Sequence, residues 1–347
     1  MKTYRIASIP ADGIGPEVIA AGLQALETLA RRDGGFDLDV TEFDWSSARY
    51  KETGALMPED GPEQLKAFDA IFFGAVGAPD VPDHITLWGL RLPICQGFDQ
   101  YANVRPTRIL PGIQTPLAGV TADDLDWVIV RENSEGEYSG HGGRAHRGMP
   151  EEVGTEVAIF TRAAVTRIMR YAFALARSRP RKLLTVVTKS NAQRFGMVMW
   201  DEIAAEIAVE FPDVGWDRML VDAMTVRMVR NPRSLDTIVA TNLHADILSD
   251  LAGALAGSLG EFARVQLHVV ADFRFVERTE DIEQRVRGGA VSHRGIDAVL
   301  VDLAEVTGNR FVEDRIVSRR ATVAVLGVPA GDLRLNVSTL EAESNIE

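Results

Sequence analysis

The chain has 347 residues, 46% of them hydrophobic, and its 37 basic and 50 acidic residues give a formal net charge of −13. This length exceeds one typical core, so we expect two domains. The acidic balance disfavours nucleic acid and anionic membranes as partners, and no apolar run approaches the ~20 residues of a membrane span. Cys95 is the only cysteine, and the first residues reach a proline and a charge too soon for a signal peptide, so a cytoplasmic protein is expected.

The first hundred residues alternate between apolar runs and helical segments. We expect strands at 4–9, 36–43 and 70–76, and helices at 17–30, 62–68 and 87–91. Gly13 and Gly15 permit a tight turn after the first strand, but Pro16 breaks the G-x-G-x-x-G pattern, so the evidence for a dinucleotide fingerprint is weak. This alternation indicates an α/β fold with a parallel sheet and crossover helices.

Three arginines follow apolar elements in the next segment. Arg91, Arg105 and Arg131 are expected at element ends around one cleft, where guanidinium groups can bind carboxylates bidentately. Each of them taken alone also fits an ordinary surface residue. A strand over 126–138 should then lead into an exposed, glycine-rich loop or arm at 139–150, followed by a strand at 156–160 and a helix at 162–177.

A second group of polar residues follows buried strands further along the chain. The strand expected at 183–187 ends in Thr188-Lys-Ser-Asn191, and Lys189 there can act as a base or remain a solvated lysine. A helix should then run through Glu206. The segment from Met219 to Asp222 is expected to close a further strand on a carboxylate.

Asp246 and Asp250 lie in a helix expected to follow a buried strand at 236–240. Their spacing of four places both carboxylates on one helix face, and two hard oxygen donors suit Mg²⁺ or Mn²⁺. The pair also fits a solvated acidic face. The apolar stripe of this helix is expected to comprise Leu243, Ile247, Leu248 and Leu251.

Together these motifs resemble the isocitrate/isopropylmalate dehydrogenase family, over about Ile6 to Gly260. The resemblance implies a two-domain α/β fold with parallel-rich sheets flanked by helices. The motifs that carry it are Asp12-Gly-Ile-Gly-Pro-Glu-Val18, Gly74-Ala-Val-Gly77, Leu90-Arg91, Ala102-Asn-Val-Arg-Pro106, Arg131-Glu-Asn-Ser-Glu-Gly-Glu-Tyr138, Thr188-Lys-Ser-Asn191, Val221-Asp222 and the helix with Asp246 and Asp250. Residues 1–102 with 258–347 would form the cofactor-side domain, and residues 103–257 the substrate, metal and dimerisation domain.

The resemblance also implies a site, cofactors and a homodimer with shared active sites. Asp246 and Asp250, with Asp222 from the partner subunit, would bind Mg²⁺ or Mn²⁺, and a monovalent cation such as K⁺ is a further candidate. Lys189, also from the partner subunit, would be the base and Tyr138 the general acid in an NAD-dependent oxidation with decarboxylation. The implied binding residues are Arg91, Arg105 and Arg131 for the substrate carboxylates, and Gly74, Val76, Gly77 and Asn191 for NAD.

Substrate choice rests on Trp88, which stands where isopropylmalate enzymes offer small aliphatic side chains. A bulky ring there favours a short dicarboxylate, and the spacing between the first two arginines resembles the subgroup of tartrate and D-malate dehydrogenases. Trp88 also fits simple core filler. Two alternatives remain open: 3-isopropylmalate dehydrogenase itself, and a non-catalytic relative.

The resemblance ends after Gly260. Residues 261–347 contain no lysine, tryptophan, tyrosine or cysteine and are rich in arginine and valine. The family motif that cradles the adenosine half of NAD is not recognisable there, which leaves NAD versus NADP open. The change in composition fits either an out-of-frame reading of a GC-rich gene or true divergence. Strands are expected at 296–302 and 321–326.

Overall fold

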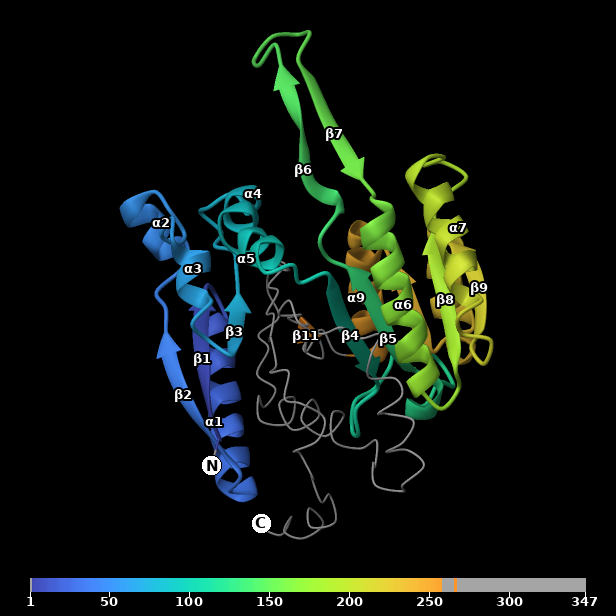
Figure 1. Cartoon of the computed structure of the whole chain (residues 1–347), viewed down its shortest axis with the longest axis horizontal. Coiled ribbons are helices and arrows are strands. Elements are labelled where there is room, and N and C mark those ends of the chain that lie inside the picture. Colours follow the sequence, from blue (N-terminus) through green and yellow to red (C-terminus); the bar gives the residue numbers. More distant parts are fainter. Residues whose placement is uncertain (1, 258–264, 267–347) are drawn as a thin grey trace. The chain divides into compact units, whose positions relative to one another are not determined.

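The computed structural model describes residues 2–257 and 265–266 (Figure 1). The described chain divides into two compact units, residues 2–93 and residues 94–257 with 265–266. The strands expected at 296–302 and 321–326 lie outside the described residues, as does the C-terminal part of the expected cofactor-side domain. The domain limits proposed from the sequence therefore stay a prediction.

The first unit is built on a three-stranded parallel sheet in the order β2-β1-β3. Helix α1 packs on this sheet, because Tyr4, Ile6, Ile19 and Phe72 form one buried cluster. The expected strands and helices are all present. The elements are β1 (Lys2–Ala11), α1 (Gly15–Asp33), β2 (Phe36–Glu42), α2 (Ser47–Thr53), α3 (Gly61–Leu65), β3 (Ala70–Ala75), α4 (Asp83–Thr86) and the π-helical turn η1 (Leu87–Arg91).

Two glycines allow β1, β3 and the start of α1 to come together. A Cβ at Gly15 would lie 2.0 Å from the carbonyl oxygen of Pro10, and a Cβ at Gly74 would lie 2.2 Å from the same atom. Real Cβ atoms do not approach backbone so closely, so both positions require glycine for packing. This gives Gly74 a structural role that the motif alone does not reveal.

The second unit contains a six-stranded sheet in the order β11-β4-β5-β10-β8-β9. Strands β5, β10, β8 and β9 are parallel, and β4 runs antiparallel to β5. The elements are α5 (Leu92–Gly97, which begins at the boundary between the units), β4 (Ala102–Arg108), the 3₁₀ turn η2 (Ala122–Asp124), β5 (Asp126–Glu132), β6 (Gly136–Ala145), β7 (Val153–Ile159), α6 (Arg162–Ser178), β8 (Leu183–Thr188), α7 (Gly196–Ala208), β9 (Gly215–Leu220), α8 (Val221–Arg230), the 3₁₀ turn η3 (Pro232–Ser234), β10 (Thr237–Ala240), α9 (Asn242–Ala256) and β11 (Val265–Gln266).

Both faces of this sheet are covered by helices. On one face Val130, Val186 and Val239 pack against α6 and α7 through residues such as Phe173 and Trp200. On the other face the strands pack against α8 and α9. Because a parallel sheet buried on both faces is nearly continuous in apolar residues, its strands are readable in the sequence.

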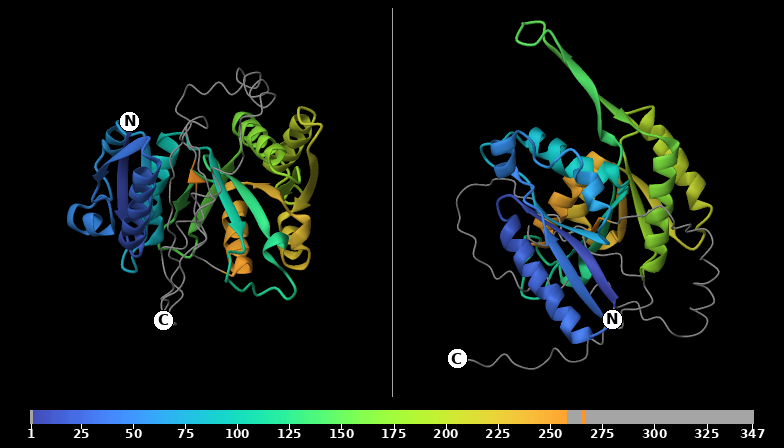
Figure 2. Two further views of the ribbon diagram at one scale, coloured as in Figure 1. Left: turned by 90° about the horizontal axis from the view of Figure 1, so that it is seen from below. Right: turned by 60° about the vertical axis from the view of Figure 1, so that its left-hand side comes forward.

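The segment expected as a glycine-rich loop or arm is a β-hairpin. Strands β6 and β7 pair antiparallel, with a register shift between Gly136 and His141, and their outer residues are exposed. Figures 1 and 2 show this ribbon extending away from the six-stranded sheet. We call it the β6–β7 arm.

Two expectations about local structure are wrong. Asp222 does not end a strand: β9 stops at Leu220, and Asp222 lies in the first turn of α8. Ile247 is not part of a buried stripe, because its side chain is 53% exposed while Ala245 and Leu248 are buried. The buried face of α9 includes the small residues Ala245 and Ala252, and Ile247 lies outside that face. Among the described residues, no helix is long and apolar enough to cross a membrane.

Candidate active site

The polar centre of the second unit lies at the start of α9. The Thr241 hydroxyl caps this helix by accepting from the backbone N–H of His244, so the first turn is held directly beyond the end of β10. Asp246 is only 5% exposed, and Asp250, one turn later, is partly buried. The prediction that both carboxylates share a helix beside the sheet's carboxyl edge is met by this geometry.

Two of the predicted arginines converge on Asp246. Arg131, on β5, donates from Nη1 to Asp246 Oδ1 at 2.5 Å, and Arg105, on β4, donates to the same oxygen at 3.3 Å. Both guanidinium groups are buried. A buried carboxylate needs such compensation, because removing an uncompensated charge from water is costly. The structure therefore places Arg105, Arg131 and Asp246 in one cluster.

Three neutral residues that the sequence interpretation missed orient these arginines. The Asn103 Oδ1 atom accepts from Arg105 Nε at 3.1 Å, and the Ser249 hydroxyl accepts from Arg105 Nη1. The Asn242 Oδ1 atom accepts from Arg131 Nε at 2.7 Å. Periodicity could have found them, because Asn103 precedes Arg105 by two residues on a strand, and Asn242 and Ser249 flank Asp246 at helical spacing.

Tyr138, at the base of the β6–β7 arm, joins the same cluster. Its hydroxyl donates to Asp246 Oδ2 at 3.3 Å, and the Arg131 guanidinium lies 5.2 Å from the centre of its ring. Its backbone carbonyl accepts from Gln96 Nε2 at 3.2 Å. The predicted general acid therefore lies beside the predicted metal ligand.

Lys189 and Asp222 form a separate pair. Lys189 Nζ lies 2.6 Å from Asp222 Oδ1, and the hydrogen bond from Lys189 keeps the pKa of this carboxyl below its usual value. No group of three His, Cys, Asp or Glu side chains placed to hold a metal occurs within the described part of the chain. Asp222 therefore does not complete a ligand set with Asp246 and Asp250 in a single chain. Asn191 is exposed on the loop that follows Lys189.

His244 and Glu137 are two further polar residues that the sequence interpretation did not single out. Burial lowers the pKa of His244, while the nearby Glu137 carboxylate raises it and the Lys189 ammonium lowers it further. Glu137 accepts from the backbone N–H of Leu243 at 3.4 Å. The first turn of α9 is thus bordered by groups of both signs.

The first unit carries the remaining predicted residues. Arg91 is buried at the end of the π-helical turn η1, and its Nε and Nη2 atoms have no hydrogen-bond partner among the described residues. Trp88, in the same turn, is 40% exposed, which argues against simple core filler. Gly77 follows Val76 with φ of +127°, and a Cβ there would meet open space. Asp12 accepts from the backbone N–H of Gly77 at 2.9 Å and thereby holds this loop.

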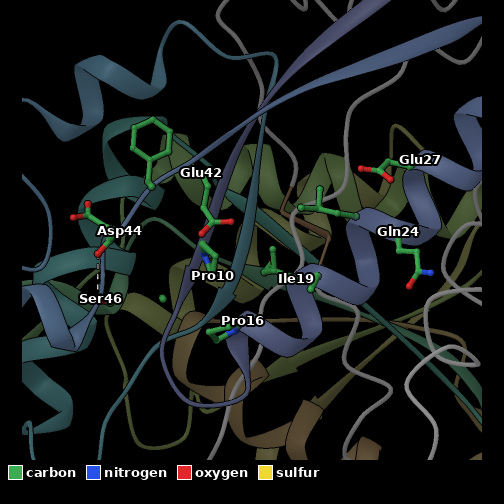
Figure 3. A pocket seen from close by; sticks show the side chains of 12 residues that line it. Pro10, Pro16, Ile19, Gln24, Glu27, Glu42, Asp44 and Ser46 are labelled. Carbon is green, nitrogen blue, oxygen red and sulfur yellow. Dashed lines mark hydrogen bonds between the residues drawn. The ribbon is translucent and has the colours of Figure 1, made fainter.

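A shallow cavity of about 460 Å³ opens beside the carboxyl ends of β1 and β2. Figure 3 shows the side chains that line it, among them Pro10, Pro16 and Ile19 and the carboxylates of Glu27 and Glu42. Acidic walls repel phosphate groups, and Pro16 removes a backbone donor at the start of α1. This cavity is therefore a poor place for the phosphates of a dinucleotide, in agreement with the broken glycine fingerprint.

Comparison with known proteins agrees with the resemblance of these motifs. The family model described as isocitrate/isopropylmalate dehydrogenase matches residues 5–281. The chain belongs to this family. The match extends beyond Gly260, to residue 281, and the chain is an enzyme of this dehydrogenase type.

Individual relatives narrow the comparison within the isocitrate/isopropylmalate dehydrogenase family. A probable tartrate dehydrogenase/decarboxylase of Agrobacterium vitis is 80% identical over 260 residues, which is 75% of this chain and 73% of the relative. The D-malate dehydrogenase [decarboxylating] of Escherichia coli is 50% identical over 262 residues, 75% of this chain and 72% of that one. The isocitrate dehydrogenase structure from Methylococcus capsulatus is 32% identical with a TM-score of 0.66, covering 78% of this chain and 75% of its own.

The donor set of α9 fits a divalent cation. Asp246 and Asp250 offer hard oxygen atoms from adjacent turns of one helix, the ligand type that Mg²⁺ and Mn²⁺ prefer. On the cofactor side, the space beside Gly77 is open and can admit a ligand. Beside Gly74, in contrast, the space that a Cβ would need is already filled by the backbone of Pro10 and Gly15. The described residues thus offer two ligands of the type that a divalent ion prefers, and they fit the nicotinamide cofactor in part.

Proposed function

We propose that this protein catalyses the NAD-dependent oxidation of a small 2-hydroxy dicarboxylate, D-malate or tartrate, with decarboxylation, using Mg²⁺ or Mn²⁺. The observation that supports it most is the convergence of Arg105, Arg131 and Tyr138 on the carboxylate of Asp246. Two buried guanidinium groups suit a ligand with carboxylates, and a carboxylate pair on the adjacent helix suits the metal.

The site residues expected from the sequence have the following roles in the proposed reaction. Arg105 and Arg131, together with Arg91, bind the substrate carboxylates and exclude a neutral ligand. Lys189 takes the hydroxyl proton while the hydrogen on C2 leaves as hydride. When bound, the nicotinamide supplies the hydride acceptor and the divalent ion supplies a Lewis acid at the 2-oxygen.

The second step breaks the bond between the substrate and its departing carboxylate. Carbon dioxide leaves, and the bonding electron pair remains as an enolate. Tyr138 then donates its hydroxyl proton to the carbon that lost the carboxylate. The hydrogen bond to Asp246 orients this hydroxyl toward the metal ligands. Atoms and charge balance, because one hydride, one proton and one CO₂ leave and one proton returns.

We further propose that the active protein is a homodimer in which Lys189 and Asp222 serve the partner's site. Support comes from the exposed apolar side chains on two helices that pack together, Val226 and Val229 on α8 and Ile247 on α9. Exposed apolar side chains on neighbouring helices are typical of a surface that contacts another chain. The projecting β6–β7 arm offers a further contact surface.

Initial-rate formation of NADH tests the function and its specificity. We expect turnover of D-malate and tartrate with Mn²⁺, loss of turnover after EDTA, and poor turnover of 3-isopropylmalate. Replacing Trp88 by Ala should shift the preference toward 3-isopropylmalate by about 10–100-fold, as expected for a few apolar contacts. Turnover of 3-isopropylmalate alone would contradict the proposal. Dicarboxylate binding without NAD binding would also contradict it, and the gene read in all frames around codon 260 would then show whether the reading frame changes there.

A further inference from the structure

Asn242 uses both ends of its side-chain amide inside the protein. Its Oδ1 atom accepts from Arg131 Nε at 2.7 Å, and its Nδ2 atom donates to the backbone carbonyl of Glu135 at 3.2 Å. The side chain is only 1% exposed. The amide orientation is unambiguous, because a guanidinium can only donate and a carbonyl can only accept.

Arg131 is consequently held along one edge by a single helix. Asn242 accepts the hydrogen bond from Arg131 Nε. Asp246, four residues later on α9, accepts the hydrogen bond from Arg131 Nη1. A guanidinium is planar, so two attachment points on one rigid helix determine the direction in which the group faces. A metal bound by Asp246 would compete with its bond to Arg131, whereas the Asn242 amide is a neutral acceptor outside the proposed ligand set.

The second hydrogen bond of the Asn242 side-chain amide reaches the segment that carries Tyr138. Glu135 precedes Gly136, which has φ of +74°, and a Cβ at Gly136 would lie 3.6 Å from Asn242 Cβ. The Glu135 carboxylate is itself fixed, because it accepts from the N–H and the hydroxyl of Thr161 at 2.7 Å each. Asn242 therefore binds the turn from which β6 and Tyr138 start.

We propose that Asn242 is a positioning residue. It fixes Arg131 and the base of the β6–β7 arm relative to the first turn of α9. Through Arg131 it orients the substrate carboxylate, and through the Gly136 turn it places Tyr138. This inference deepens the proposed function and rests on it for the substrate, but the clamp itself is a property of the protein alone.

Chemical modification tests the clamp without substrate. Phenylglyoxal labelling followed by peptide mass spectrometry should show Arg131 reacting at least about tenfold faster in Asn242→Leu, which lacks both bonds, than in the wild type. Asn242→Asp keeps the acceptor, so Arg131 should stay protected in that variant. Arg105 is the internal reference, because it is equally buried but bound by Asn103. The clamp would be overturned if Arg131 reacted as slowly in Asn242→Leu as in the wild type. It would also be overturned if Asn242→Leu increased the labelling of Arg105 and Arg131 equally.

Calorimetry of D-malate binding in the presence of Mg²⁺ tests the consequence for substrate. Asn242→Leu should weaken binding at least about tenfold while the melting profile stays cooperative. The matched control is Asn231→Leu, the same change at an exposed asparagine after α8, which should bind as the wild type does. Unchanged affinity in Asn242→Leu would refute the positioning role. A wild type that binds no dicarboxylate would instead refute the proposed function, and the labelling experiment would still decide on the clamp.

Discussion

The two carboxylate oxygens of Asp246 have different partners. Oδ1 accepts from Arg105 and Arg131, and Oδ2 accepts from the Tyr138 hydroxyl. The arginines make the buried charge tolerable, because a charge-assisted hydrogen bond recovers part of the lost hydration. At this scale one aspartate connects the anion-binding groups to the proposed general acid.

Replacing Tyr138 by Phe should separate binding from chemistry. The ring remains over Arg131, so the KM for D-malate should stay within about threefold, whereas kcat should fall about 10²–10⁴-fold because the proton donor is lost. Steady-state rates of NADH formation measure both constants. Tyr171→Phe is the matched control, since Tyr171 lies on α6 and packs edge-on against Tyr101 at the margin of the core. A kcat equal to that of the wild type would exclude Tyr138 as the acid.

Strand β10, which leads directly into α9, is fastened at its start by an ion pair. The buried Asp236 accepts from Arg179 Nε at 2.6 Å, and its second oxygen accepts from the backbone N–H of Leu183 at 3.3 Å. Arg179 follows α6 and Leu183 begins β8, so one carboxylate joins three elements. The position of α9, and with it that of Asp246, depends on this junction.

Arg179→Ala should destabilise the protein by about 3 kcal/mol, because Asp236 would remain buried without its cationic partner. Urea unfolding followed by circular dichroism measures the change. Arg162→Ala is the comparison, since Arg162 pairs with Glu206 on the exposed surface and its removal should cost less than about 1 kcal/mol. An equal loss of unfolding free energy in the two variants would show that the burial of Asp236 does not increase the cost of removing its cationic partner.

The molecule as a whole carries the proposed metal ligands in two places. Asp246 and Asp250 lie on α9, whereas Asp222 binds Lys189 in the first turn of α8. No three such ligands gather within the described residues. The proposed homodimer accounts for this separation if its sites are completed across a two-fold axis, because each chain then supplies the two halves to different sites.

Subunit complementation tests the shared site. Lys189→Met and Asp246→Asn should each give an inactive homodimer, since each removes one half of every site. After mixing and reassociation, heterodimers contain one intact site, so about a quarter of the wild-type activity should return when chains pair at random. A mixture that stays inactive although it exchanges subunits would place both residues in the site of one chain.

Much of the fold was readable from the sequence because parallel strands buried on both faces are continuous apolar runs. The strands β8 and β10 and the helix α6 were placed within one or two residues, whereas the strand expected at 126–138 divides into β5 and the start of β6. The errors occurred where local pattern competes with packing. Ile247 was expected inside because it is apolar, but the small residues Ala245 and Ala252 form the close contact with the sheet.

The sequence alone determined the family, the order of the elements and the chemical types in the site, since these depend on residue identity and spacing. Only the tertiary structure showed that Arg105 and Arg131 share one oxygen of Asp246, and that Asn242 holds Arg131. Such contacts join residues more than a hundred positions apart, and no local periodicity encodes them. They are decided by where β4, β5 and α9 pack, because burial forces each charged group to find its partner there.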